Sequence, residues 1–74
     1  MSAAKQIDRL VKMANQIALN TGARFDAAES ARRTAEHLCK FWTPAMRGQL
    51  TDHWRAGGDG LEPAVMSALD ALSE

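Results

Sequence analysis

Apolar residues recur along the chain at the three- and four-residue intervals that bring side chains to one face of an α-helix. This spacing predicts a first helix over residues 3–19, with a packed face made of Ile7, Leu10, Val11, Ala14, Ile17 and Ala18. Met13 lies at the edge of that face. The polar stretch Asn20-Thr21-Gly22-Ala23 follows, and we expect Gly22 to end the helix in the left-handed conformation that glycine tolerates.

The second predicted helix begins at Phe25 or Asp26 and continues to Phe41 or Trp42. Asp26 is a suitable N-cap, and Glu29 three residues later is typical of a capping box. The apolar face of this helix is expected to be small at its beginning and bulky at its end, with the members Ala28, Ala31, Ala35, Leu38 and Trp42.

Thr43 and Pro44 interrupt the second helix, because proline disfavours a helical residue before it and suits the first turn of a new helix. With Thr43 as the cap, the third helix should continue to Arg55 or Ala56. Gly48 lies inside this helix, at a cost of about 1 kcal/mol relative to alanine unless another group packs closely on it.

The glycine-rich stretch over residues 57–60 ends the third helix, and Glu62-Pro63 begins a fourth. Val65, Leu69 and Leu72 form the last apolar face, with Leu61 before them. We therefore predict an all-α fold: one small domain over residues 1–74, a bundle of about four short helices joined by tight glycine and proline corners.

Composition indicates that this domain has little apolar surface to bury. Hydrophobic residues make up 46% of the 74-residue chain, but many are alanine, which favours helix and contributes little burial. A domain of this size normally needs disulfides, a metal ion, very good helix packing or a partner. Cys39 is the only cysteine, so a disulfide within the chain is excluded, and a lone cysteine fits a reducing compartment.

Charge and hydropathy favour a cytoplasmic protein. Nine basic and nine acidic residues cancel, so no overall charge attracts the chain to nucleic acid or to an anionic membrane. Residues 1–8 lack the apolar run of a secretory signal, and no apolar stretch approaches the roughly 20 residues needed to cross a bilayer.

The candidate chemical groups do not form a convincing catalytic or metal site. His37 and Cys39 are two residues apart, so on a regular helix they point about 200° away from each other and cannot share one metal ion or act as a nucleophile and base. We interpret Cys39 as a small core residue and expect His53 to interact with carbonyls at its helix end. We predict no catalytic, cofactor-binding or metal-binding residues in this chain.

A helix-turn-helix is the competing function. The second and third helices meet at a tight corner, and Arg47, Gln49 and Arg55 would then reach a DNA groove. The proline at the corner, the apolar third helix and the lack of a basic excess disfavour this interpretation.

Three blocks of sequence identify a family. They are Lys-Met-Ala-Asn-Gln-Ile over residues 12–17, the His37, Phe-Trp, Pro44, Met-Arg and Leu50 pattern over residues 37–50, and Gly58, Gly60-Leu61 and Pro63 near the last corner. Together they resemble the delta subunit of soluble NAD-dependent formate dehydrogenases. The similarity extends from residue 7 to about residue 70. At position 43, Thr43 replaces the aspartate that is more usual in the family.

The resemblance implies a non-catalytic accessory subunit of an enzyme that oxidises formate to CO2 and reduces NAD. In such complexes a large alpha subunit holds a molybdenum bis-MGD centre and iron–sulfur clusters. A beta subunit carries FMN and the NAD site, and a gamma subunit carries a further iron–sulfur cluster. The delta subunit looks cofactor-free, and its implied role is to bind the large subunit and to stabilise or help assemble the complex.

A chain with more large apolar residues than its own core needs should bury some of them in a partner. Asn15 and Gln16 are polar residues beside an apolar stripe, and they could be solvated or bind a partner's backbone. Arg47 lies among apolar residues with no evident acceptor in the chain. The predicted partner-binding surface comprises Met13, Asn15, Gln16, Ile17, Phe41, Trp42, Pro44, Met46 and Arg47.

Overall fold

A computed structural model describes the backbone of residues 3–22 and 24–73 and the side chains of residues 6–22 and 24–73. Within these ranges the chain forms helices and no strand, which confirms the all-α prediction. The elements are α1 (Ala3–Gly22), α2 (Ala27–Phe41), α3 (Pro44–Arg55) and α4 (Pro63–Leu72).

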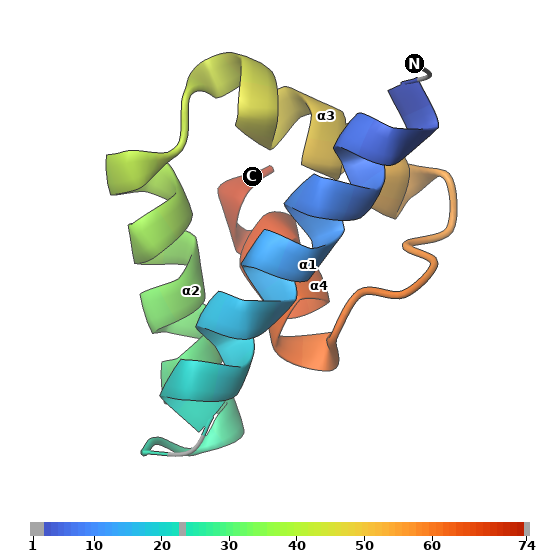
Figure 1. Ribbon diagram of the computed structural model, residues 1–74. Coiled ribbons are helices and arrows are strands. Elements are labelled where there is room, and N and C mark those ends of the chain that lie inside the picture. Colours follow the sequence, from blue (N-terminus) through green and yellow to red (C-terminus); the bar gives the residue numbers. More distant parts are fainter. Residues whose placement is uncertain (1–2, 23, 74) are drawn as a thin grey trace.

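The two N-terminal helices form an open V that the other two helices fill and close (Figure 1). The end of α1 and the start of α2 lie close together, and α2 turns back beside α1. The start of α1 and the end of α2 lie farther apart. α4 lies behind α1 and packs against α2 and α1, while α3 crosses the open end of the V. The core between them consists of Leu10, Ala14, Ala18, Leu38, Trp42, Leu50, Leu61, Val65 and Leu69.

The structure confirms the predicted starts of α2 and α3. The Asp26 carboxylate accepts a hydrogen bond from the backbone N–H of Glu29 at 2.9 Å, and α2 begins at the next residue after Asp26. The Thr43 hydroxyl accepts one from the N–H of Met46 at 3.2 Å, directly before Pro44 in the first position of α3. Each cap satisfies an amide that the first turn of a helix leaves without a partner.

The prediction that Gly22 ends the first helix in a left-handed conformation is wrong. Gly22 is the last residue of α1 and has a negative φ; the glycines with positive φ are Gly57, Gly58 and Gly60. The N–H groups of Arg24 and Phe25 both donate to the carbonyl of Thr21 at 3.0 Å, directly after the end of the helix. Ala23, part of the same predicted break, lies outside the described residues.

The packed face of α2 also differs from the prediction at its beginning. Ala28 is exposed, whereas Ser30 and Thr34 are buried with Ala35 and Leu38. Burial of the two hydroxyl residues is possible because Thr34 donates to the carbonyl of Ser30 at 2.8 Å and the Ser30 hydroxyl lies 2.6 Å from that of Thr21. The contact between Ser30 and Thr21 connects the start of α2 to the end of α1.

Candidate functional site

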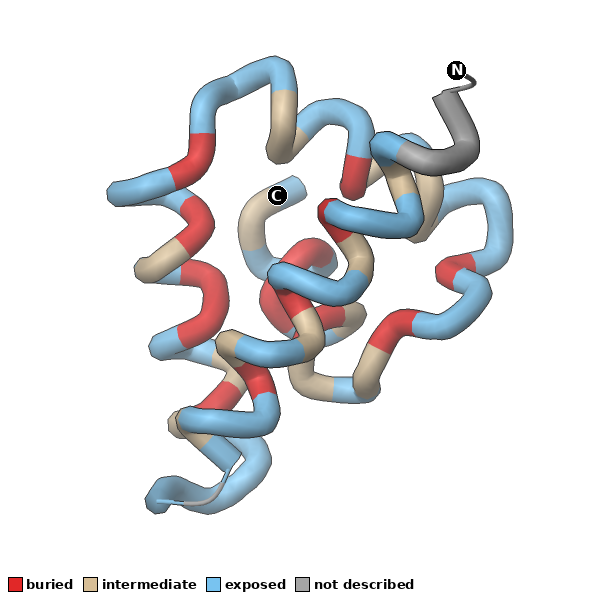
Figure 2. The backbone as a smooth tube through the Cα atoms, in the orientation of Figure 1, coloured by how far each residue is buried: buried red, intermediate tan, exposed pale blue. Residues whose placement is uncertain are grey.

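The predicted partner-binding residues fall into three groups that differ in exposure. Met13, Gln16, Phe41 and Pro44 are exposed (Figure 2). Ile17 and Met46 are partly buried against the core, and Trp42 is part of it. Asn15 and Arg47 are half-buried, and each makes hydrogen bonds inside this chain. Contact of these nine residues with a partner stays a prediction.

Asn15 connects α1 to the start of α4. Its amide nitrogen donates to the carbonyl of Gly60 at 2.8 Å, and its amide oxygen accepts from the N–H of Glu62 at 2.9 Å. Glu62 is the N-cap position of α4 but makes no side-chain cap of its own, so Asn15 supplies the acceptor that this helix start needs. The amide is therefore neither simply solvated nor free for a partner's backbone, the two alternatives that the sequence left open.

Arg47 holds the corner between α2 and α3. Its guanidinium donates to the carbonyl of Trp42 at 2.7 Å and to those of Leu38 and Cys39 at 3.2 and 3.3 Å. These carbonyls lie at the end of α2, where the helix dipole favours a cation. The Leu38 carbonyl also accepts from the N–H of Trp42 at 3.2 Å, whereas the last carbonyls of a helix have no partner within it. The expectation that the chain supplies no acceptor for Arg47 is wrong.

The positions of Cys39 and His53 also differ from what the sequence predicted. Cys39 is exposed and not a core residue, because the packed face of α2 passes through Leu38 and Trp42. His53 lies 2.7 Å through its Nε2 from the carbonyl of Asp59, which belongs to the loop after α3 and not to the helix end.

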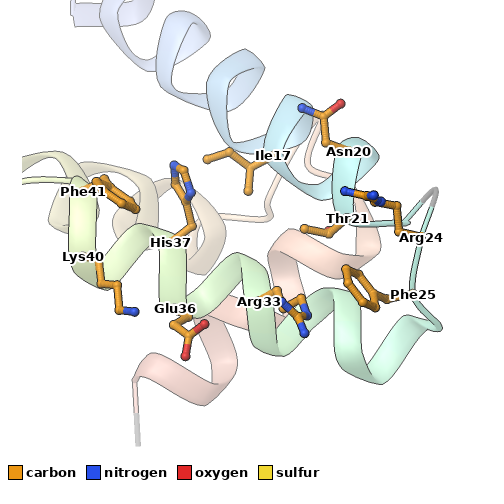
Figure 3. Close-up of a pocket in the computed structure, with 10 residues that line it drawn as sticks. All are labelled: Ile17, Asn20, Thr21, Arg24, Phe25, Arg33, Glu36, His37, Lys40 and Phe41. Carbon is orange, nitrogen blue, oxygen red and sulfur yellow. The ribbon is translucent and has the colours of Figure 1, made fainter.

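A groove of about 350 Å³ runs between the C-terminal half of α1 and the outer face of α2 (Figure 3). Ile17 and Thr21 contribute to it from α1, and His37 points between the two helices from α2. The remaining lining residues are Asn20, Arg24, Phe25, Arg33, Glu36, Lys40 and Phe41. The groove therefore brings together Ile17 and Phe41 from the predicted surface.

One end of the groove is aromatic and basic. The Arg33 guanidinium lies over the ring of Phe25, 4.1 Å from its centroid, and its Nε donates to the Glu29 carboxylate at 2.8 Å. Glu29 also binds Arg32, whose hydrogen bond lowers the pKa of the Glu29 carboxyl below its usual range. Arg24, on the connection before α2, is exposed, and the described residues give it no ion-pair partner.

The other end is formed by an exposed aromatic pair. The rings of His37 and Phe41 have centroids 4.7 Å apart and are tilted by 46°. Phe41 is 70% exposed, the largest value among the exposed large apolar residues of the described chain. Met13 in α1 is 43% exposed and does not line the groove. Met13 precedes Ile17 by four residues, so both project from one side of α1.

A second, more apolar groove of about 500 Å³ lies on the other side of Phe25, where the end of α1 meets the beginnings of α2 and α4. Leu19, which is 55% exposed, lines it together with Ala18 and Ala64. Glu62 is the one charged residue in its lining. Phe25 thus separates a basic groove from an apolar one.

Two further findings bear on the function. Among the described residues, no three side chains of the types His, Cys, Asp and Glu lie close enough together to hold a metal ion. None of the helices, over the same residues, is both long and apolar enough to cross a bilayer.

Comparison with protein families gives a match over most of the chain. The model of the family described as NADH-dependant formate dehydrogenase delta subunit FdsD matches residues 9–69, most of the 74-residue chain. This chain belongs to that family. The delta-subunit resemblance drawn from the sequence blocks is therefore confirmed, over nearly the same residues. Neither the curated proteins nor the solved structures compared with the chain gave a match.

The groove of this delta-subunit family member contains residues that were not among the predicted partner-binding residues. Arg24, Phe25 and Arg33 lie in the segment over residues 20–35, which carries no family signature. A signal was present nonetheless: Arg33, His37 and Phe41 are spaced four residues apart and form a charged and aromatic stripe on the outer face of α2. The alanines of this helix indicated only a packed face.

Proposed function

We propose that this chain is a non-catalytic accessory subunit of a cytoplasmic NAD-dependent molybdenum formate dehydrogenase, and that it binds the large catalytic subunit. The observation that carries the proposal is the match to the delta-subunit family over residues 9–69. The chain stabilises the complex or assists its assembly. Molybdenum, iron–sulfur, flavin and NAD chemistry belongs to the alpha, beta and gamma subunits, and this chain binds no cofactor.

The exposed apolar side chains support a docking role. A 74-residue chain has few large residues in its core, so it gains little by leaving Phe41 and Met13 in water. Such side chains become stabilising when a partner covers them, and aromatic residues are common anchors in protein interfaces. Phe41 and Met13 are therefore the members of the predicted surface that we place in the interface first.

Co-purification tests this proposal. We expect the tagged chain, expressed together with the other subunits of the formate dehydrogenase, to elute with the large subunit in one complex that oxidises formate. Omission of the chain should lower the yield or the lifetime of the assembled complex. A chain that elutes alone as a folded monomer in that experiment would contradict the proposal.

The same preparation separates the two possible roles. If the chain stabilises the finished complex, the complex formed without it should contain its normal molybdenum and lose activity faster on storage. If the chain assists maturation, the large subunit made without it should contain less molybdenum from the start. Metal analysis and the decay of activity measure the two outcomes.

A further inference from the structure

We infer that the groove between α1 and α2 holds a segment of the large formate dehydrogenase subunit that carries a carboxylate near one end and an apolar side chain near the other. This inference rests on the proposed function and assigns the docking site and the chemistry of its occupant. Figure 3 shows the groove open along its length, with the basic end at Arg24 and Phe25 and the aromatic end at His37 and Phe41.

The charges of the groove favour an acidic occupant. The chain as a whole is neutral, yet Arg24, Arg33 and Lys40 line this groove with Glu36 as the single carboxylate. Glu36 lies 3.8 Å from Arg32 on the outer side of α2, so its charge is partly neutralised away from the groove. A carboxylate that enters between the helices therefore meets a local excess of cations.

Two of these cations have no acidic partner among the described residues. Arg33 is already bonded to Glu29, but neither Arg24 nor Lys40 has a salt bridge or side-chain hydrogen bond among the described residues. Both are exposed, and Arg24 lines the same end of the groove as Phe25 (Figure 3). A guanidinium in this position can bind a carboxylate through two parallel hydrogen bonds.

The length and shape of the groove select a peptide segment. Phe25 and Phe41 mark its ends. The Phe25 ring packs against Arg33, which lies eight residues before Phe41, and α2 rises about 1.5 Å per residue, so the ends are roughly 12 Å apart. An extended segment of about four residues covers that distance at roughly 3.3 Å per residue. Its carboxylate would pair with Arg24, and its apolar side chain would cover Phe41 and Ile17.

Charge reversal in the assembled complex tests the assignment. We expect the double variant Arg24→Glu/Lys40→Glu to bind the large subunit at least about tenfold more weakly than the natural chain. The neutral variant Arg24→Gln/Lys40→Gln should lose less. The binding of the natural chain should also weaken between about 50 and about 300 mM NaCl, and that of the reversed variant should depend less on salt. Both positions are exposed, so circular dichroism should show a folded chain in each case.

The matched control reverses two exposed cations outside the groove, in the variant Lys12→Glu/Arg55→Glu. It changes the net charge by the same amount and should bind within about twofold of the natural chain. Equal loss in both double variants, or unchanged affinity of Arg24→Glu/Lys40→Glu, would overturn the assignment while leaving the proposed subunit role intact. Failure of the natural chain to bind would instead refute that role, and the assignment with it.

Discussion

The two proline corners of this chain are built from the same parts but held together differently. In each, a buried apolar residue precedes the N-cap, Trp42 at the first corner and Leu61 at the second, and a proline begins the next helix. Both corners leave backbone groups that need partners. The first corner uses Arg47, which lies five residues beyond Trp42, and the second uses Asn15, from the other end of the chain.

This difference decides what each corner can offer a partner. Asn15 and Arg47 were both expected to face another protein, yet each satisfies the backbone of its own chain. The first corner nonetheless adjoins the 70% exposed Phe41, which immediately precedes Trp42. The comparison teaches that an unusual polar residue in an apolar neighbourhood indicates an internal hydrogen bond as readily as an interface. Phe41, which makes no such internal hydrogen bond, is the residue of this corner that we propose for docking.

The largest effect on stability is expected when the buried residue of either corner is replaced by alanine. Trp42→Ala should lower the free energy of unfolding by about 3–5 kcal/mol, because Trp42 is 5% exposed and packs in the core. Leu61→Ala should cost about 2–4 kcal/mol for the same reason. A domain this small has a total stability of that order, so Trp42→Ala should be largely unfolded in thermal and urea denaturation.

Loss of complex assembly in Trp42→Ala would thus report unfolding and would say little about docking. A Trp42→Ala chain with the natural melting temperature would contradict the placement of Trp42 in the core.

The next effect is expected from the two polar residues that hold the corners. Arg47→Met keeps an apolar stem but removes three hydrogen bonds to carbonyls, and it should cost about 2 kcal/mol. Asn15→Ala should cost about 1 kcal/mol, since the lost pair of bonds is partly offset by the better helix propensity of alanine. Chemical denaturation measures both values.

Gln16→Ala is the matched control for Asn15→Ala. Gln16 is exposed and its amide donates only to Asn20 at 3.2 Å, so the substitution should leave stability unchanged or raise it slightly. Equal losses at positions 15 and 16 would show that Asn15 does not hold the second corner.

Contacts that hold the corners could be predicted from the sequence only where the interacting residues are close together along the chain. Asp26, Thr43 and the two prolines act within one helical turn, so capping and proline rules located the helix starts correctly. Asn15 binds residues 45 and 47 positions away, which no local pattern reveals.

The errors within helices have a different cause. Alanine is compatible with either side of a helix, so Ala28 was wrongly placed on the packed face of α2. Ser30 and Thr34 were overlooked because their burial depends on hydrogen bonds to α1 and to their own helix. The candidate groove was missed because it combines the end of α1 with a face of α2 that the apolar pattern treats as solvent-exposed.

The smallest stability effects are expected at one glycine near each corner, and they should have opposite signs. Gly48 has no atom within 4 Å of the position of an added Cβ, so Gly48→Ala should raise stability by about 1 kcal/mol. Gly58 has φ +67 and the sulfur of Met66 3.3 Å from that position, so Gly58→Ala should lower stability by about 1–2 kcal/mol.

Melting temperatures of the two glycine variants test this pair. A destabilised Gly48→Ala would contradict the open space around Gly48 in α3. A Gly58→Ala chain of natural stability would contradict the left-handed conformation of Gly58 in the loop before the second corner.

The affinity of Phe41→Ser for the large formate dehydrogenase subunit is the most direct test of docking beside the first corner. Phe41 is mostly in water, so its loss should change the stability of the free chain by less than about 0.5 kcal/mol. Ala45→Ser, at an exposed position in the first turn of α3, is the control. We expect a folded Phe41→Ser chain that binds at least about tenfold more weakly, as for an aromatic interface anchor. Natural affinity in a folded Phe41→Ser chain would contradict the account.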